Sequence, residues 1–408
     1  MGQNRVGGVQ LKKGKMKYLR IIKLTVGAVL YYIFSALVPK KNNLWVFGSW
    51  KGKNYSDNSK VLFEYVVKNH PNINALWIAK NMSVYNELES KGLPVALYSK
   101  WSTKWKVIRA AANIQTESNE DTGRFRVGGT KVIQLFHGYG AVKEAYLYPG
   151  MGRLKKAIVK IYADNHSTSY WMVPSEYFVN RLPFLFDANK RKMFVTGQPR
   201  IDLLYQHKKC DFFEQIKMER PNSKFLFYAP THRNYAVSNR LDFGREEWEN
   251  FNEFCRNNDF ILFFKPHPLE LSKYVKNFQS LSNIILLKND IKGCPIDPYE
   301  YMHYFDMMIS DYSSISTDYL VYDRPIVHFM YDFETFADES FSLDALNTFV
   351  AGPICKNWEE LYEFINQSFT TDSYKGLRAS AMKNALKYLD GNNSKRVYEK
   401  VVEITKCS

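Results

Sequence analysis

The sequence lacks the features that mark several common protein classes. Its 408 residues include only five cysteines, and no two of them form a Cys-x-x-Cys pair. Scattered cysteines in odd number argue against a disulfide framework and a zinc site, and they favour a reducing compartment. Internal repeats and low-complexity tracts are also absent. What remains is an ordinary globular composition in a chain long enough for two or three domains.

Four familiar catalytic and ligand-binding motifs are missing as well. There is no Gly-x4-Gly-Lys-Ser/Thr, no Gly-x-Gly-x-x-Gly after a predicted strand, and no Gly-x-Ser-x-Gly. These absences argue against a P-loop kinase, a nicotinamide enzyme and an α/β-hydrolase. No compact Asp-x-Asp follows a predicted strand, so we expect neither a metal nor another cofactor.

Acidic residues are absent before Asp57, whereas residues 1–23 are rich in lysine and arginine. An apolar run of 15 residues follows, Leu24–Val38. A spanning helix usually needs about 20 apolar residues, and no Ala-x-Ala-like cleavage site follows the run. We therefore expect residues 1–42 to be a basic amphipathic membrane anchor that enters one leaflet and meets anionic lipid. The alternative is a core helix with a disordered basic tail.

The formal net charge of +15 favours anionic partners, such as a phosphorylated substrate or an anionic membrane surface. The basic residues are dispersed and no nucleic-acid-binding module is present, so we expect no nucleic-acid partner.

From Asn43 onward, strand-like and helix-like segments alternate, which predicts an α/β fold with doubly wound parallel sheets. The predicted strands include 44–49, 73–80, 94–99, 131–138, 224–233, 260–268, 307–310 and 325–330. The predicted helices include 102–112, 245–257, 295–305 and 316–322. The polar stretch 205–223 is predicted to connect two such domains, which face a cleft. Ligands in these sheets bind outside the carboxyl ends of the strands.

His137 stands at one predicted strand end and is followed by Gly138 and Gly140. An imidazole titrates near neutral pH, so His137 is a candidate general base that removes a hydroxyl proton. The two glycines allow the backbone to approach a ligand closely. The alternative is a structural turn capped by the histidine.

Two further strand ends carry candidate phosphate-binding groups. Thr231 and Arg233 follow one strand, and a guanidinium suits bidentate phosphate contacts. His267 lies between two prolines after another strand and could steady charge on a phosphate or leaving group. The alternatives are a solvated loop and a rigid turn with an exposed histidine.

The segment after the strand 307–310 combines Asp311 with Ser313 and Ser314 at a predicted helix start. Free amides and hydroxyls at a helix N-terminus can bind an anion. Asp311 would repel a phosphate, so we expect it to orient neighbouring donors or to contact a neutral hydroxyl. The alternative is an ordinary serine N-cap.

Several motifs in one order resemble the CDP-glycerol glycerophosphotransferase family, the teichoic-acid primases and polymerases. The similarity runs from Leu44 to about Arg396. The matching segments are WVFGS, YSDNSKVLFEYV, QLFHG, VTGQPRIDLL, YAPTHR, KPHP, ISDYSSISTDYLVYDRPIVHF, MYDFETF, AGPI and DGNNSKRV.

The resemblance implies a GT-B type fold, no metal, and a place at the cytoplasmic face of the cell membrane, peripheral or monotopic. The anchor at 1–42 is followed by two predicted Rossmann-like domains and by closing helices at 373–408. The resemblance implies that the domain at 43–210 binds the acceptor and that the domain at 211–372 binds the CDP donor. The implied phosphotransferase moves a polyol phosphate, glycerol phosphate first, from a CDP-polyol to a hydroxyl of a lipid-linked wall or capsule polymer, and CMP leaves.

Site residues follow from the matched motifs. The implied catalytic residues are His137 and His267, and Gly138 and Lys143 lie on the acceptor side. The implied donor-binding residues are Thr231, Arg233, Asp311, Ser313, Ser314 and Asp318. The family usually has His-Gly-Thr-Pro-Leu-Lys where this chain has His-Gly-Tyr-Gly-Ala-Val-Lys at 137–143. The change keeps His137 and leaves the acceptor and the polyol, glycerol or ribitol, open.

Two other functions share these features. A nucleotide-sugar glycosyltransferase of the same fold would release a nucleoside diphosphate in place of CMP. A non-catalytic, membrane-bound polyanion-binding protein would keep the basic surface and tolerate loss of His137 and His267.

Overall fold

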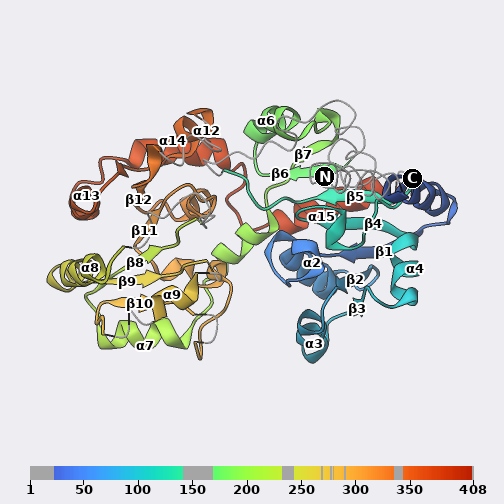
Figure 1. Ribbon diagram of the computed structural model, residues 1–408. Helices are drawn as coiled ribbons and strands as arrows, with labels where there is room; N and C mark the ends of the chain where they lie inside the picture. The colour runs from blue at the N-terminus through green and yellow to red at the C-terminus, as the bar shows by residue number, and fades with distance from the viewer. Residues whose placement is uncertain are drawn as a thin grey trace, which may run out of the picture.

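The structure is a computed structural model that describes residues 23–140, 169–231, 243–267, 270–275, 278, 280–288, 291–334 and 343–406. The described residues form two parallel β-sheets that are flanked by helices (Figure 1). The alternation in the sequence predicted this arrangement. The basic stretch 1–22, Lys143 and Arg233 lie outside the described residues.

The first sheet has the strand order β3-β2-β1-β4-β5-β6-β7 and the second has β10-β9-β8-β11-β12-β13. The strands of the first are β1 Lys41–Phe47, β2 Asn74–Ala79, β3 Val95–Leu97, β4 Ala110–Gln115, β5 Lys131–Gln134, β6 Tyr170–Val173 and β7 Met193–Val195. Those of the second are β8 Lys224–Tyr228, β9 Phe260–Phe264, β10 Ile284–Leu286, β11 Met307–Ser310, β12 Ile326–Phe329 and β13 Ile354–Cys355.

In both sheets the order reverses at one strand pair, β1/β4 in the first and β8/β11 in the second. All of these pairings are parallel, so the carboxyl ends of neighbouring strands share one edge. A doubly wound sheet binds its ligand at that edge, next to the reversal. The topology therefore directs attention to the residues that follow β1, β4, β5, β8 and β11.

The α-helices are α2 Asp57–Asn69, α3 Met82–Ser90, α4 Trp101–Arg109, α6 Glu176–Phe186, α7 Asp211–Glu219, α8 Arg245–Asn257, α9 Leu271–Val275, α10 Ile315–Tyr319, α12 Leu343–Phe349, α13 Trp358–Thr370, α14 Lys375–Ala385 and α15 Asn393–Lys406. The 3-10 segments are η1 Trp50–Gly52, η2 Asn119–Asp121, η3 Lys190–Lys192, η4 Pro199–Tyr205, η5 Pro298–Glu300, η6 Met302–Tyr304 and η7 Leu320–Tyr322. Helix α8 shows why such segments are helical: it buries Trp248, Phe251 and Cys255, which share one face at helical spacing.

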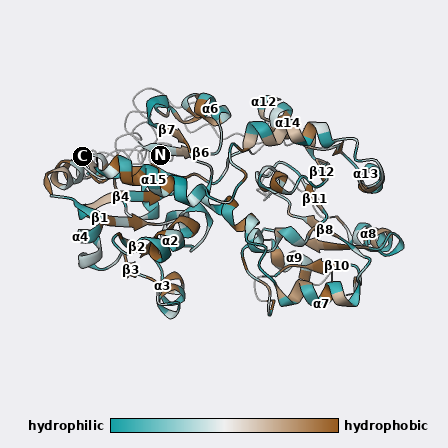
Figure 2. Cartoon of the chain, turned by 180° about the vertical axis from the view of Figure 1, so that it is seen from behind, coloured by the Kyte–Doolittle hydropathy of each residue, from teal (hydrophilic) through white to brown (hydrophobic). Residues whose placement is uncertain are grey.

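One hydrophobic core joins the two sheets. It contains Trp171 of β6 and Phe227 of β8, together with Ile201 of η4 and Tyr319 of α10. Separate cores cover the other faces of the two sheets. In Figure 2 the brown, hydrophobic colour marks strands β1, β8 and β10, in keeping with these buried layers.

Helix α15 returns to the first sheet, although it follows the second sheet in sequence (Figure 1). Val397 and Val401 of α15 join the core that contains Trp45 of β1. The carboxylate of Asp202 in η4 accepts hydrogen bonds from the backbone N–H groups of Asn393 and Ser394, at 2.8 and 2.7 Å. The closing helices at 373–408 thus include one that completes the first sheet.

Three sequence-based boundaries were wrong. The helix predicted at 102–112 ends at Arg109, because Ala110–Gln115 is the buried strand β4 and alanine favours helices only where packing allows it. The helix predicted at 295–305 is two 3-10 turns, η5 and η6, and Pro298 starts the first of them. The predicted connection 205–223 contains helix α7, which buries Phe213.

The apolar run near the start of the chain forms a helix at 23–37. It packs through Ala28 and Ser35, which are 3% and 0% exposed. The Ser35 hydroxyl accepts a hydrogen bond from the backbone N–H of Gly128 at 2.8 Å. Among the described residues, no helix has the length and apolar character needed to cross a bilayer.

Candidate active site

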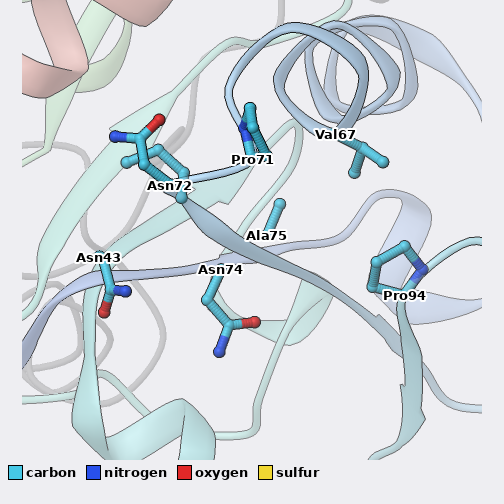
Figure 3. Close-up of a pocket in the computed structure, with 8 residues that line it drawn as sticks. Asn43, Val67, Pro71, Asn72, Asn74, Ala75 and Pro94 are labelled. Atoms are coloured by element: carbon cyan, nitrogen blue, oxygen red, sulfur yellow. The ribbon is translucent and has the colours of Figure 1, made fainter.

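Two open cavities lie away from the carboxyl ends of the strands. One of about 320 Å³ is lined by residues such as Asn43, Asn74 and Pro94 at the amino ends of β1, β2 and β3 (Figure 3). Another of about 420 Å³ is lined by Ser223, Asp259 and Asn283, just before β8, β9 and β10. Neither is placed where a doubly wound sheet binds its ligand. The candidate site therefore lies at the opposite, carboxyl edges of the sheets.

His137 lies at the carboxyl edge of the first sheet, just beyond β5. Its ring is 4.8 Å from the ring of Trp50, which follows β1. The Nδ1 atom of His137 is buried and has no hydrogen-bond partner among the described residues. Because the side chain as a whole is only half-buried, the imidazole combines a sheltered nitrogen with an accessible surface. That combination suits a group that exchanges a proton with a ligand.

The backbone around His137 adopts rare conformations. Trp50, Lys51, Asp57 and Phe136 have φ angles of 47°, 58°, 68° and 51°, in the left-handed region. Bulky side chains rarely adopt these angles, and such strain persists only where surrounding contacts hold it. Several loops at this edge are therefore held in shape by their neighbours.

Asp121 supplies one of these restraints. Its carboxylate accepts hydrogen bonds from the backbone N–H groups of Lys51, Thr116 and Glu117, at 2.7, 2.8 and 2.8 Å. This contact ties the loop after β1 to the loop after β4 and places Glu117 near His137. Burial raises the pKa of Glu117, Asp121 adds to the increase, and His137 opposes it.

At the carboxyl edge of the second sheet, Asp311 is 0% exposed and organises the switch point between β8 and β11. The Thr231 hydroxyl donates to Asp311 Oδ1 at 2.6 Å, and the Thr231 N–H lies 2.9 Å from Oδ2. The backbone N–H of Tyr312 donates to Oδ1 at 2.7 Å. Asp311 therefore orients donors of neighbouring residues.

His328 of β12 supports this edge from within the sheet. Its Nδ1 lies 3.4 Å from the carbonyl oxygen of Asp311, and its Nε2 accepts a hydrogen bond from the Ala351 N–H at 3.1 Å. Burial lowers the pKa of His328 to about 4. His328 is thus a neutral structural histidine at physiological pH.

Ser313 and Ser314 precede the short helix α10 and are half-buried. The Ser313 hydroxyl accepts a hydrogen bond from the Ile315 N–H at 3.4 Å, and the Ser316 hydroxyl donates to the Ser313 carbonyl at 2.8 Å. Ser314 makes no side-chain capping bond. Its half-buried hydroxyl is placed at the same edge as Thr231.

His267 follows β9 on the same edge. Its carbonyl accepts a hydrogen bond from the Glu270 N–H at 2.8 Å, which folds the turn. Lys265, two residues earlier, donates its backbone N–H to the Tyr228 carbonyl at 2.9 Å, and burial lowers the pKa of its ammonium group. Lys265 and His267 therefore follow β9 at the same edge of the sheet as Thr231 and Asp311.

The loop after β5 touches the second sheet's helix α10. The Thr317 hydroxyl donates to the Gly140 carbonyl at 2.7 Å. Gly140 has φ +76°, and an added Cβ would lie 2.5 Å from Thr317 Oγ1. Gly140 was expected to allow close approach of a ligand, and in the structure it allows close approach of α10.

Asp318 is 1% exposed and pairs with Arg200 of η4, whose Nη2 lies 2.8 Å from Oδ2. The Tyr299 hydroxyl donates to the same oxygen. The structure thus places Asp318 in a buried pair between the sheets, and its predicted role in donor binding stays a prediction.

The structure brings the predicted residues together in two groups. His137 and Gly138 lie at the first edge, and Thr231, His267, Asp311, Ser313 and Ser314 lie at the second. Arg233 and Lys143 fall outside the described residues. No group of three or more histidine, cysteine, aspartate or glutamate side chains in the described part of the chain could hold a metal ion.

Sequence reasoning gave no role to Arg200, Asp57 or Glu117. Arg200 lies in the matched motif VTGQPRIDLL next to Ile201, and a charged residue that is buried is a usable signal of a partner. Asp57 was noted only as the first acidic residue of the chain. Glu117 had no such signal, because its position depends on Asp121.

Two parallel sheets that share the order of their first six strands, with a histidine after one sheet and a carboxylate-ordered hydroxyl edge on the other, define a two-sheet α/β protein of GT-B type. The model of the family described as CDP-Glycerol:Poly(glycerophosphate) glycerophosphotransferase matches residues 30–403. The chain belongs to this family, which confirms the resemblance seen in the motifs and, with it, the class of enzyme predicted.

Curated relatives agree with this assignment. The chain is 25% identical over 389 residues to the teichoic acid poly(glycerol phosphate) polymerase of Bacillus subtilis, covering 91% of this chain and 50% of that protein. It is 24% identical over 413 residues to the teichoic acid glycerol-phosphate transferase of Staphylococcus aureus, covering 93% and 98%. It is also 26% identical over 291 residues to a teichoic acid ribitol-phosphate polymerase of S. aureus, covering 68% and 48%. The chain thus spans about half the length of the first and nearly all of the second.

Solved structures share the fold. The wall teichoic acid polymerase TagF, as a histidine-to-alanine variant, superposes with a TM-score of 0.72 at 19% identity and covers 98% of both chains. The S. aureus MnaA–UDP structure gives a TM-score of 0.57 at 12% identity, covering 91% of this chain and 98% of that chain. The predicted GT-B type fold is confirmed.

Proposed function

We propose that this chain transfers glycerol phosphate from CDP-glycerol to a hydroxyl group of an acceptor, with release of CMP. The observation that supports this most directly is the contact between the two edges, where Gly140 of the His137 loop meets Thr317 of α10 at 2.7 Å. This contact sets the loop of the proposed base against α10, the helix that follows the proposed donor-side residues Ser313 and Ser314. A direct transfer requires both groups at one place.

In the proposed reaction His137 removes the proton from the acceptor hydroxyl. The resulting oxygen attacks the β-phosphorus of CDP-glycerol, the bond from that phosphorus to the bridging oxygen breaks, and CMP leaves with the electron pair. His267, Arg233 and the hydroxyls of Ser313 and Ser314 offset negative charge on the two phosphates. Asp311 acts indirectly, because it fixes Thr231. We expect no metal requirement, so an excess of EDTA should leave CMP release unchanged.

The acceptor proposed is a hydroxyl of a lipid-linked wall or capsule polymer. The relatives include glycerol-phosphate and ribitol-phosphate enzymes, so either polyol fits the family. Glycerol phosphate is preferred because the family description names it.

A membrane-facing surface is proposed on the first sheet. The helix at 23–37 exposes Leu30 and Leu37, which are 62% and 80% exposed, and Trp101 of the neighbouring α4 is 82% exposed. The Lys40 ammonium joins the two segments through the Ile108 carbonyl at 2.6 Å, and Figure 1 shows the dark-blue helix beside α4. Lys104 lies over the Trp101 ring at 4.5 Å. An apolar face rimmed by lysines suits an anionic lipid surface.

Vesicle flotation tests this surface. Leu30→Glu combined with Trp101→Glu should weaken binding to anionic vesicles at least tenfold. The control Met218→Glu, which changes an exposed apolar side chain of α7, should leave binding unchanged. Equal binding by all three proteins would contradict the proposed surface.

CMP release tests the function itself. Purified protein in detergent is offered CDP-glycerol, CDP-ribitol or a sugar nucleotide, each with a membrane-lipid acceptor extract. Release of CMP with CDP-glycerol should fall at least a thousandfold in His137→Ala, while CDP binding persists. His70→Ala is a matched control, because His70 stacks on Tyr398 at the opposite edge of the sheet. Release of a nucleoside diphosphate from the sugar nucleotide, or near wild-type turnover in His137→Ala, would contradict the proposal.

A further inference from the structure

Arg200 lies in η4, the light-green segment between the two sheets in Figure 1, and is 5% exposed. Its Nη1 donates to the backbone carbonyl of His137 at 2.8 Å and to Asp57 Oδ1 at 3.1 Å. Its Nη2 pairs with Asp318 Oδ2 at 2.8 Å. One side chain therefore contacts the backbone of the candidate base and a helix of the donor edge.

The guanidinium is well suited to this double contact. Its planar, fork-shaped donors can serve partners on two sides at once, which a lysine ammonium cannot do in the same geometry. Burial alone would lower the pKa of Arg200, but Asp318 and the neighbouring polar groups raise it above its ordinary value. Arg200 therefore stays charged between its two carboxylates.

A second contact holds the residue before His137. The backbone N–H of Arg200 donates to Asn58 Oδ1 at 3.0 Å, and Asn58 Nδ2 donates to the Phe136 carbonyl at 2.7 Å. Phe136 has φ 51°, which a phenylalanine rarely adopts without restraint. Two consecutive carbonyls thus accept hydrogen bonds that depend on Arg200. The Phe136 carbonyl is bound through Asn58, and the His137 carbonyl is bound directly by Arg200.

On the other side, Asp318 belongs to α10, which begins after Ser313 and Ser314. The Tyr299 hydroxyl donates to Asp318 and orients its carboxylate toward Arg200. A displacement of α10 would change the Asp318–Arg200 pair, and through it the restraint on His137.

We propose that Arg200 is a positioning residue that couples the donor-side helix α10 to the loop of His137. The inference rests on the proposed function and deepens it: the base is held in its working orientation only while Asp318 of α10 engages Arg200. Arg200 touches no reacting atom in this scheme and acts through His137.

The test compares Arg200→Lys and Asp318→Asn with Lys60→Gln. Lys60 also links the two parts of the molecule, through Glu300 at 3.4 Å and Asp297 at 3.9 Å, but among the described residues it makes no hydrogen bond or ion pair with the His137 loop. For Arg200→Lys we expect kcat to fall at least a hundredfold while the KM for CDP-glycerol changes less than threefold. In Asp318→Asn kcat should fall at least tenfold. In the double variant kcat should fall no further than in Arg200→Lys alone. Lys60→Gln should keep kcat within threefold.

Hydrogen exchange provides a readout that does not depend on turnover. Peptides covering residues 135–140 should exchange at least tenfold faster in Arg200→Lys and Asp318→Asn, and at the wild-type rate in Lys60→Gln. If wild-type protein releases no CMP, the proposed function fails while the exchange result still decides the coupling. Equal kcat losses in Lys60→Gln and Arg200→Lys, or unchanged exchange at 135–140 in both Arg200→Lys and Asp318→Asn, would overturn it. If Arg200→Lys does not fold, Asp318→Asn decides alone.

Discussion

The carboxyl edges of the two sheets share a topology but are built in opposite ways. At the first edge, left-handed backbone at Trp50 and Phe136 surrounds His137, whose Nδ1 has no hydrogen-bond partner among the described residues. At the second edge, Asp311 receives hydrogen bonds from Thr231 and Tyr312 and is backed by His328. The first edge holds strained backbone and an imidazole with an unpartnered nitrogen, whereas the second holds a buried carboxylate whose two oxygens both accept hydrogen bonds. Proton transfer needs an available group, and charge stabilisation needs fixed donors.

Removing the Asp311 carboxylate at the second edge should have the largest effect on stability. In Asp311→Ala the N–H groups of half-buried Thr231 and buried Tyr312 lose their acceptor, so we expect the free energy of unfolding to fall by about 3 kcal/mol. Affinity for CDP-glycerol should fall with it. Urea denaturation and calorimetric titration measure the two effects.

Asp306 provides the control at the opposite end of the same strand. It accepts a hydrogen bond from the Phe225 N–H at 2.9 Å. Asp306→Ala should cost about 1 kcal/mol and leave CDP-glycerol affinity unchanged. Equal affinity losses in the two variants would show that Asp311 has no special place at this edge.

Lowering the pH should destabilise the folded protein through His328, which supports the second edge. Its pKa in the folded chain is about 4, below the ordinary value of 6.5. Between these two pH values the unfolded chain binds the proton and the folded chain does not, so stability falls as the pH is lowered. We expect the free energy of unfolding to fall by about 2 kcal/mol across this pH window. The fall should be smaller in His328→Gln. Urea denaturation at a series of pH values measures it. An identical pH dependence in both proteins would contradict this.

The junction between the edges is tested by Gly140→Ala. Left-handed backbone costs an alanine about 1–2 kcal/mol, and the new Cβ would meet Thr317. We expect the melting temperature and CMP release both to fall. Gly376→Ala is the control, because its Cβ would meet no atom within 4 Å, and it should be neutral or slightly stabilising. Equal losses in Gly140→Ala and Gly376→Ala would show that the contact between Gly140 and Thr317 tolerates an added side chain.

The smallest effect is expected at Trp50. Trp50→Leu removes the ring beside His137, and such aromatic contacts contribute about 0.5–1.5 kcal/mol. We expect kcat to fall about threefold, which corresponds to ~0.7 kcal/mol. Phe184→Leu, which changes an exposed aromatic side chain of α6, should leave kcat unchanged. A larger loss in Phe184→Leu would contradict the placement of Trp50 beside the base.

Much of this arrangement could be predicted from local patterns. The apolar periodicity of α8 gave its boundaries correctly, and polar residues after buried strands identified both edges. Where local preference and packing disagree, prediction failed: the predicted helix continued over the helix-favouring alanines 110–112, which are buried as the start of β4. The role of Arg200 could not be predicted, because its partners lie 63 and 143 residues away along the chain at His137 and Asp57.

Helix α15 has a consequence for how the protein is made. Residues 393–406 supply part of the core of the first sheet, and Asp202 binds the N-terminus of that helix. A ribosome therefore synthesises all seven strands of the first sheet, and then the whole second sheet, before it releases the segment that completes the first. The apolar face that Val397 and Val401 later cover stays exposed during that interval. The nascent chain therefore avoids aggregation only if chaperones cover this face or if translation and folding finish quickly.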